Sequence, residues 1–166
     1  MPTSVPGTCS HRGFTLIELL VVLLVMGLIA GLVGALVHPD DRAVLRVEAE
    51  RLSELLDLAA TEARLTGTSV AWVADAAGYR FWQLREDTGW SEARSDALRA
   101  RSLPPGVAIS DLRVEAMRPP GGMRLEFGPH GSLAYDLQMS LGAASYAVAA
   151  SPLGEVSVHA SPHAAP

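Results

Sequence analysis

The chain has 166 residues, enough for one modest domain with accessory segments. It carries 13 basic side chains, all of them arginine, against 18 acidic ones, and its formal net charge is −5. A general nucleic-acid-binding protein needs a basic face for the phosphates, so this balance argues against that class. The single cysteine, Cys9, excludes a disulfide within the chain.

The hydrophobic residues are concentrated in one segment. Between residues 14 and 37, Glu18 is the only ionisable side chain. A helix of about 24 residues measures roughly 36 Å, which is long enough to cross a bilayer. Arg12 precedes the segment and Asp40-Asp41 follows it, so the positive-inside tendency places the amino end in the cytoplasm. The sequence therefore predicts a transmembrane helix.

Two simpler explanations of this segment fit less well. A secretory signal peptide has a shorter apolar core, followed by a cleavage site of small residues. Here the apolar segment is longer and leads directly into a second helical pattern. A plain single-pass anchor fits the length, but it gives no reason for the residues from Gly13 to Glu18.

A second, amphipathic helix is predicted beyond His38-Pro39. The proline removes a backbone donor and restricts the residue before it, so the first helix is interrupted or kinked there. Asp40 or Asp41 can cap the restart. Apolar side chains then recur at three- and four-residue steps, at Leu45, Ala49, Leu52, Leu56, Ala59 and Ala63. Such a stripe needs a packing partner, and we expect the helix to end near Thr66-Gly67.

The remainder predicts a β-rich head. Short strand-forming runs, most of them separated by turns with Pro and Gly, cover residues 69–74, 79–84, 98–103, 107–117, 123–127, 133–141, 145–149 and 156–159. Residues 85–96 predict a polar loop, in which Trp90 serves either loop packing or a contact surface. A long helix followed by short strands indicates an α+β fold with antiparallel sheets.

One stretch is far more specific than the rest. It reads Arg12-Gly13-Phe14-Thr15-Leu16-Ile17-Glu18 and runs directly into the apolar helix. It resembles the class III signal of type IV pilins and type II secretion pseudopilins. In that family a membrane aspartyl peptidase cuts after the glycine and methylates the new amino-terminal residue. The resemblance implies cleavage between Gly13 and Phe14, N-methylation of Phe14, and prepilin peptidase as a partner.

Glu18 needs an explanation of its own, because a carboxylate in a membrane helix costs roughly 2.5–3.5 kcal/mol on insertion scales. The resemblance implies an assembly role, in which Glu18 pairs with the new amine of a neighbouring subunit. At about 4 Å and an effective dielectric of about 20, this attraction is on the order of 4 kcal/mol before desolvation. The plainer alternative is a glutamate near the interface beside an ordinary anchor.

Short segments farther along the chain look like the minor pseudopilin H group of type II secretion. They lie at residues 51–67, 78–81, 103–107, 127–131 and 154–156. The resemblance implies a pilin-like fold, with a long amino-terminal helix packed on an antiparallel β-sheet head. It also implies a tip-proximal structural subunit of the pseudopilus, which supports export of folded proteins across the outer membrane.

The resemblance implies partners and a location as well. The expected partners are the minor pseudopilins I, J and K, the major pseudopilin G and the inner-membrane assembly platform. The expected location is the bacterial inner membrane, single-pass, with a cytoplasmic amino terminus and a periplasmic head that is extracted into a periplasmic pseudopilus. The sequence has no nucleophile-elbow pattern and no paired metal-ligand spacing, so we expect no enzyme activity, cofactor or metal.

The predicted organisation has five segments. Residues 1–13 are a leader, 14–37 a transmembrane and assembly helix, 38–66 an amphipathic helix of the head, 67–160 the β-rich periplasmic head and 161–166 a flexible tail.

Two other functions remain open at this point. The first is a minor pilin of a type IV pilus, for assembly or DNA uptake. DNA-binding relatives carry a basic motif near the carboxyl end, whereas no arginine follows Arg124 here, which argues against nucleic acid as a partner. The second is a membrane-anchored periplasmic domain that never polymerises and keeps its leader.

Overall fold

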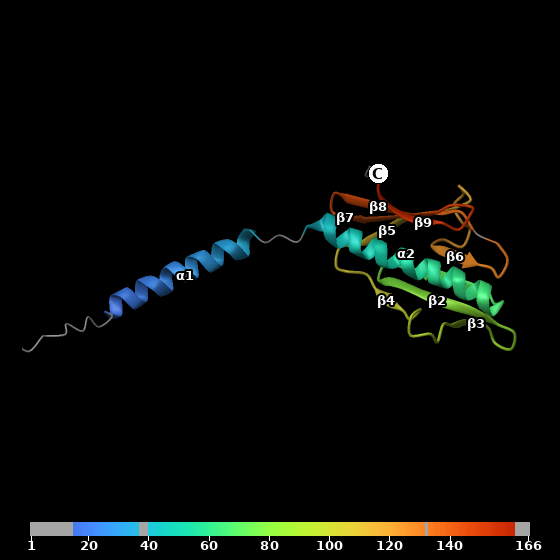
Figure 1. Cartoon of the computed structure of the whole chain (residues 1–166), viewed down its shortest axis with the longest axis horizontal. Coiled ribbons are helices and arrows are strands. Elements are labelled where there is room, and N and C mark those ends of the chain that lie inside the picture. Colours follow the sequence, from blue (N-terminus) through green and yellow to red (C-terminus); the bar gives the residue numbers. More distant parts are fainter. Residues whose placement is uncertain (1–14, 37–39, 132, 162–166) are drawn as a thin grey trace, which may run out of the picture. The chain divides into compact units, whose positions relative to one another are not determined.

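The computed structural model describes residues 15–36, 40–131 and 133–161 (Figure 1). The contacts within the chain separate a unit of residues 1–38 from a unit of residues 39–166, which we call the head. The first unit contains α1 (Leu16–Leu36), and the head contains α2 (Asp41–Thr66) and, among the described residues, nine strands. The predicted cleavage site at Gly13 and Phe14 and the tail from residue 162 lie outside the described residues.

The helix α1 begins directly after Thr15. The backbone N–H of Glu18 donates to the Thr15 hydroxyl at 3.3 Å and to the Thr15 carbonyl at 3.1 Å. A threonine cap of this kind satisfies a backbone donor that the first turn leaves free. Glu18 thus occupies the first turn, where the helix dipole favours a negative charge.

In the described part of the chain, no helix combines the length and the hydropathy required of a membrane span. The ends of the predicted span, residues 14 and 37, are outside the described residues, and the span stays a prediction.

The helix α2 is capped at both ends as expected. Asp40 accepts a hydrogen bond from the Arg42 backbone N–H at 3.0 Å, and Gly67 follows the last turn with a φ of 70°. Glycine adopts this left-handed conformation without the strain that a Cβ would add. All six residues of the predicted stripe are completely buried: Leu45, Ala49, Leu52, Leu56, Ala59 and Ala63. The amphipathic helix is therefore confirmed.

The strands form two antiparallel sheets. Sheet A has the order β3-β2-β1-β6, with β4 also paired to β2, and consists of β1 (Val70–Ala74), β2 (Gly78–Arg85), β3 (Gly89–Glu92), β4 (Arg101–Ser102) and β6 (Arg124–Phe127). Sheet B has the order β5-β7-β8-β9 and consists of β5 (Ala108–Val114), β7 (Tyr135–Leu141), β8 (Ala144–Ala150) and β9 (Val156–Ala160).

The core lies between α2 and both sheets. The helix contacts β1 and β6 of sheet A and β7, β8 and β9 of sheet B (Figure 1). In sheet A, Trp72 pairs with Phe81 on one side and Leu125 on the other, and all three side chains are completely buried. Residues directly opposite each other in antiparallel strands share a face, so this row points at α2. The α+β architecture with antiparallel sheets is confirmed.

Some strand predictions were wrong. Residues 85–96 are not simply a loop, because they contain β3, in which Trp90 pairs with Leu84. The strand expected at 107–117 ends at Val114, where the chain reverses through Glu115 and Ala116 at φ values of 50° and 66°. Two-residue hairpin turns of this shape usually carry Asn or Gly, so neither of these residues signals a turn.

Truncation of the core stripe provides the first prediction. We expect Leu52→Ala to lower the free energy of unfolding by roughly 2–5 kcal/mol, because it leaves a cavity at a completely buried site. Leu65→Ala, on the same helix at 82% exposure, is the matched control and should change it by less than about 0.5 kcal/mol. Urea unfolding of the full chain in detergent measures both. Equal effects of the two changes would contradict the packing described.

Candidate functional site

The sequence predicts three site residues, of which the structure describes one. Gly13 and Phe14 lie outside the described residues, and Glu18 lies exposed in the first turn of α1. Glu18 is the only ionisable residue of α1, and among the described residues its carboxylate has no ion-pair partner. Within the part of the chain that the structure describes, no positive group neutralises this carboxylate.

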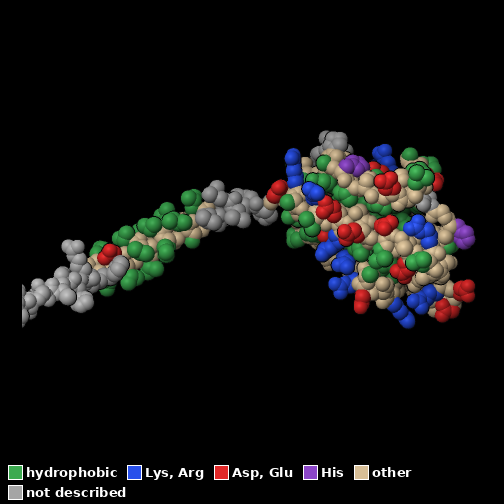
Figure 2. Space-filling view, in the orientation of Figure 1, with side chains coloured by type: hydrophobic (Ala, Val, Ile, Leu, Met, Phe, Trp, Pro, Cys, Tyr) green, Lys and Arg blue, Asp and Glu red, His purple; other side chains and the backbone are tan. Residues whose placement is uncertain are grey.

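The surface around Glu18 is hydrophobic. All large apolar side chains of α1 from Leu16 to Leu32 are exposed, with fractions between 46% at Val22 and 80% at Leu16. Figure 2 shows hydrophobic side chains along this helix, whereas the surface of the head carries charges of both signs. A helix that is hydrophobic all round is normally buried in lipid or among other helices. The first unit thus presents a surface that needs a partner.

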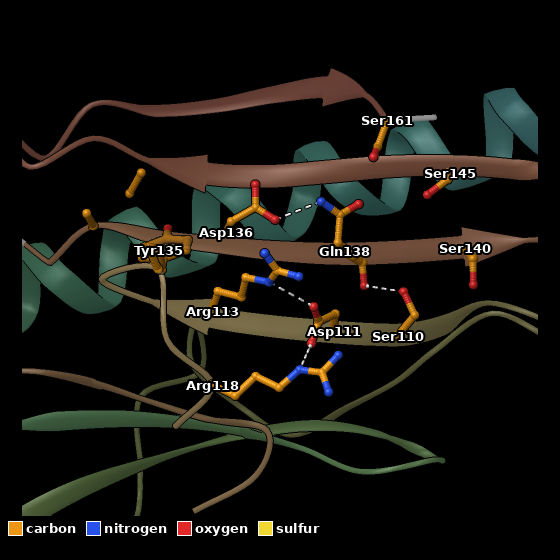
Figure 3. Close-up of a pocket in the computed structure, with 13 residues that line it drawn as sticks. Ser110, Asp111, Arg113, Arg118, Tyr135, Asp136, Gln138, Ser140, Ser145 and Ser161 are labelled. Carbon is orange, nitrogen blue, oxygen red and sulfur yellow. Dashed lines mark hydrogen bonds and ion pairs between the residues drawn. The ribbon is translucent and has the colours of Figure 1, made fainter. Parts of the chain in front are cut away.

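The head offers a groove of about 900 Å³ on sheet B. Along β7, Leu137 and Met139 are buried in the core, whereas Asp136, Gln138 and Ser140 line the groove on the face away from α2 (Figure 3). This alternation follows from the two-residue period of a strand. Most of the residues that line the groove have polar side chains, which can hydrogen-bond to another protein.

The charges in the groove are paired with one another. Asp111 accepts hydrogen bonds from Arg113 Nε at 3.2 Å and from Arg118 Nε at 2.9 Å (Figure 3). Burial acts to raise the pKa of Asp111, but these two guanidinium groups outweigh it and hold that pKa below its usual value. Nearby, Gln138 donates to Asp136 at 2.7 Å. The described residues hold no cluster of three or more metal-ligating side chains.

Trp90 packs on its own sheet. The Arg124 guanidinium lies 4.5 Å from the centroid of the Trp90 ring, although the two residues lie on the opposite edge strands β6 and β3. Their contact must therefore cross β1 and β2 on the face away from the core. Ala71 of β1 is completely buried although it is not part of the core between α2 and the sheets, as expected for a residue that this contact covers. Of the two roles considered for Trp90, the structure supports packing.

Sequence reasoning missed one residue of interest, Glu48. It is the only buried charged residue among those described, and it lies in the stripe of α2 that packs on the sheets. Tyr79 donates a hydrogen bond to its carboxylate at 3.2 Å, and Arg51 donates another at 3.3 Å. Its position three residues after Leu45 and four before Leu52 was the available signal, because it places a carboxylate on the apolar side of the helix.

The pairing of Asp111 provides a pH-dependent prediction. A carboxyl whose pKa falls on folding adds stability that is present above its unfolded-state pKa of about 3.9 and is lost as the pH drops through the folded-state value. We expect Asp111→Asn to lower stability at pH 7 by up to about 1 kcal/mol, since both arginines are exposed. Urea unfolding from pH 7 downward should show this difference shrinking below about pH 4.

The exposed Glu92 provides the control for that series. Glu92→Gln removes a carboxylate for which the described structure gives no ion pair, so its stability should follow the wild type at every pH. A difference between Asp111→Asn and the wild type that stays constant down to pH 2 would contradict the pairing.

Comparison with known proteins agrees with the fold described above. Two solved structures of the minor pseudopilin EpsH from the type 2 secretion system of Vibrio cholerae are similar to this chain. The first has 22% identity and a TM-score of 0.57 over 70% of this chain and 96% of that chain, and the second has 19% and 0.58 over 70% and 94%. At these identities the likeness shows the fold, which is pilin-like. None of the curated proteins matches the chain.

Two family models match the chain in adjacent parts. Residues 9–34 match the prokaryotic N-terminal methylation motif, which includes Gly13, Phe14 and Glu18. Residues 48–154, well over half of the chain, match the type II transport protein GspH. The chain therefore belongs to the type II transport protein GspH family, the H-type minor pseudopilins.

Proposed function

We propose that this chain is a tip-proximal structural subunit of the type II secretion pseudopilus and supports export of folded proteins across the outer membrane. The observation that carries the proposal is the contrast between the two units. The head has a core of its own between α2 and the two sheets, whereas α1 exposes apolar side chains around a single carboxylate. A subunit whose stalk is buried by neighbouring stalks has this organisation.

The amino-terminal chemistry follows from the same proposal. Prepilin peptidase cuts between Gly13 and Phe14 and methylates Phe14, in line with the methylation motif at residues 9–34. The new positive amine then precedes the Thr15 cap, at the end of α1 where the helix dipole disfavours a positive charge. A carboxylate such as Glu18 of the adjacent subunit compensates that charge. The pair forms only at one axial offset between the two helices, so it sets their register.

The location and the other partners belong to the proposal as well. The helix over residues 14–37 spans the inner membrane once, with the amino terminus in the cytoplasm and the head in the periplasm, until the subunit is extracted into the pseudopilus. Minor pseudopilins I, J and K and the major pseudopilin G contact it, and the inner-membrane platform assembles it. The chain works by position, without catalysis. The family match is to a type II transport protein, so it favours secretion over the alternative of a type IV pilus.

Replacement of the single α1 carboxylate tests the proposal. In cells that lack this chain but keep the rest of the secretion system, the wild-type chain should restore export of a folded reporter protein. We expect Glu18→Gln to reduce incorporation into the pseudopilus about tenfold, which corresponds to a loss of about 1.4 kcal/mol in docking. Cross-linking to the major pseudopilin measures incorporation, and reporter activity in the medium measures export.

Leu19→Val, the neighbouring position in α1, is the matched control and should behave as the wild type. The mass of each variant shows whether the leader has been removed, which separates a defect in docking from a defect in processing. Normal incorporation of Glu18→Gln would reject the role of Glu18. Normal export in cells without this chain would reject the secretion function itself.

A further inference from the structure

The buried stripe of α2 repeats itself along the helix. Leu45, Leu52 and Ala59 are separated by seven residues each, as are Ala49, Leu56 and Ala63, and all six are completely buried. Seven residues are close to two turns, so after such a step another apolar side chain, leucine or alanine, faces the same direction. The apolar pattern by itself therefore permits more than one position of the helix along the sheets.

Glu48 breaks this repeat. The equivalent position seven residues later is Leu55, which is also buried. The side chain of Glu48 is only 4% exposed, and a carboxylate buried to this degree is unfavourable unless it is paired and hydrogen-bonded. A shift of α2 along or around its axis would place this charge against apolar side chains. Glu48 thus makes alternative positions of the helix costly.

The partner of Glu48 on sheet A is held firmly. Tyr79 of β2 is 2% exposed, and its ring contacts Trp72 and Phe81, with both centroids at 6.2 Å. The ordinary pKa of a tyrosine hydroxyl, about 10, already keeps it a donor at neutral pH. Burial, followed by the charge of Glu48, raises the pKa of the Tyr79 hydroxyl further. The second donor, Arg51, comes from the next turn of α2 and bonds the other carboxylate oxygen.

We propose that Glu48 is the residue that fixes the position of α2 against sheet A, at some expense in stability. A single buried polar residue specifies the register of helices in coiled coils in the same way. The outer side of α2, with Val47 at 63% exposure next to Glu48, is thereby held at one orientation relative to the two sheets. On the proposed function, this determines which surface the head presents to neighbouring subunits.

The test measures the position of α2 directly. In the full chain in detergent, with Cys9→Ser, nitroxide labels at Glu54→Cys on α2 and Glu92→Cys on β3 report one distance by pulsed electron resonance. Both positions are exposed. We expect one narrow distance distribution in this background. Glu48→Leu should give a second distance or a clearly broadened one, while its unfolding midpoint in urea stays the same or rises.

Matched variants separate position from stability. Glu50→Leu removes an exposed carboxylate paired with Arg46 on the same helix, and it should keep the single narrow distance. Glu48→Gln retains an acceptor for the Tyr79 hydroxyl, and it should also give the single narrow distance. If Glu48→Leu does not fold, Tyr79→Phe removes only the hydroxyl from a ring that remains packed, and it should broaden the distance.

A single unchanged distance in Glu48→Leu, or in Tyr79→Phe where it serves as the substitute, overturns the proposal whatever the stability of the variant. These distances are measured in the isolated chain and do not depend on assembly. If the distances change as expected but the export assay does not give the expected result, the proposed function is rejected and the role of Glu48 stands. If export behaves as expected but the distances do not change, the role of Glu48 is rejected and the proposed function stands.

Discussion

The packing of one stripe of α2 against two sheets holds the head together. Each sheet is antiparallel and buries one face, and the same helix covers both buried faces. Completely buried side chains of α2, such as Leu52 and Leu56, therefore join sheets that are hydrogen-bonded only within themselves. Because the core uses one side of α2 and one face of each sheet, the other side and the other faces are available for contacts with other proteins.

The two units differ in how their charged side chains are paired. In the head, many charged side chains are paired locally, such as Arg46 with Glu50 and Asp111 with two arginines. Exposed pairs of this kind contribute little to stability, and they leave a polar surface without a strong field. In α1, by contrast, the single carboxylate of Glu18 has no ion-pair partner among the described residues. On the proposed function, Glu18 would gain a partner for this charge when α1 packs against a neighbouring subunit.

Much of this organisation was predictable, because it depends on local patterns. The spacing of the α2 stripe, the cap at Asp40 and the left-handed Gly67 follow from short-range geometry, and most strands lie between Pro and Gly turns. The reversal at Glu115-Ala116 was not predictable, since neither residue type signals a positive φ. The pairing of β1 with β6, far apart in sequence, depends on the tertiary fold. Glu48 was missed because its partner Tyr79 becomes visible only once sheet A is in place.

If α1 becomes an assembly stalk after processing, the chain recovered from membranes has lost its leader, and its mass and amino-terminal sequence show whether it has. The measurement is made with and without co-expressed prepilin peptidase. We expect a chain that starts at methylated Phe14 only where the peptidase is present. A chain that still starts at Met1 in the presence of active peptidase would contradict the role of α1 as a stalk, and would leave a head on an unprocessed amino-terminal segment.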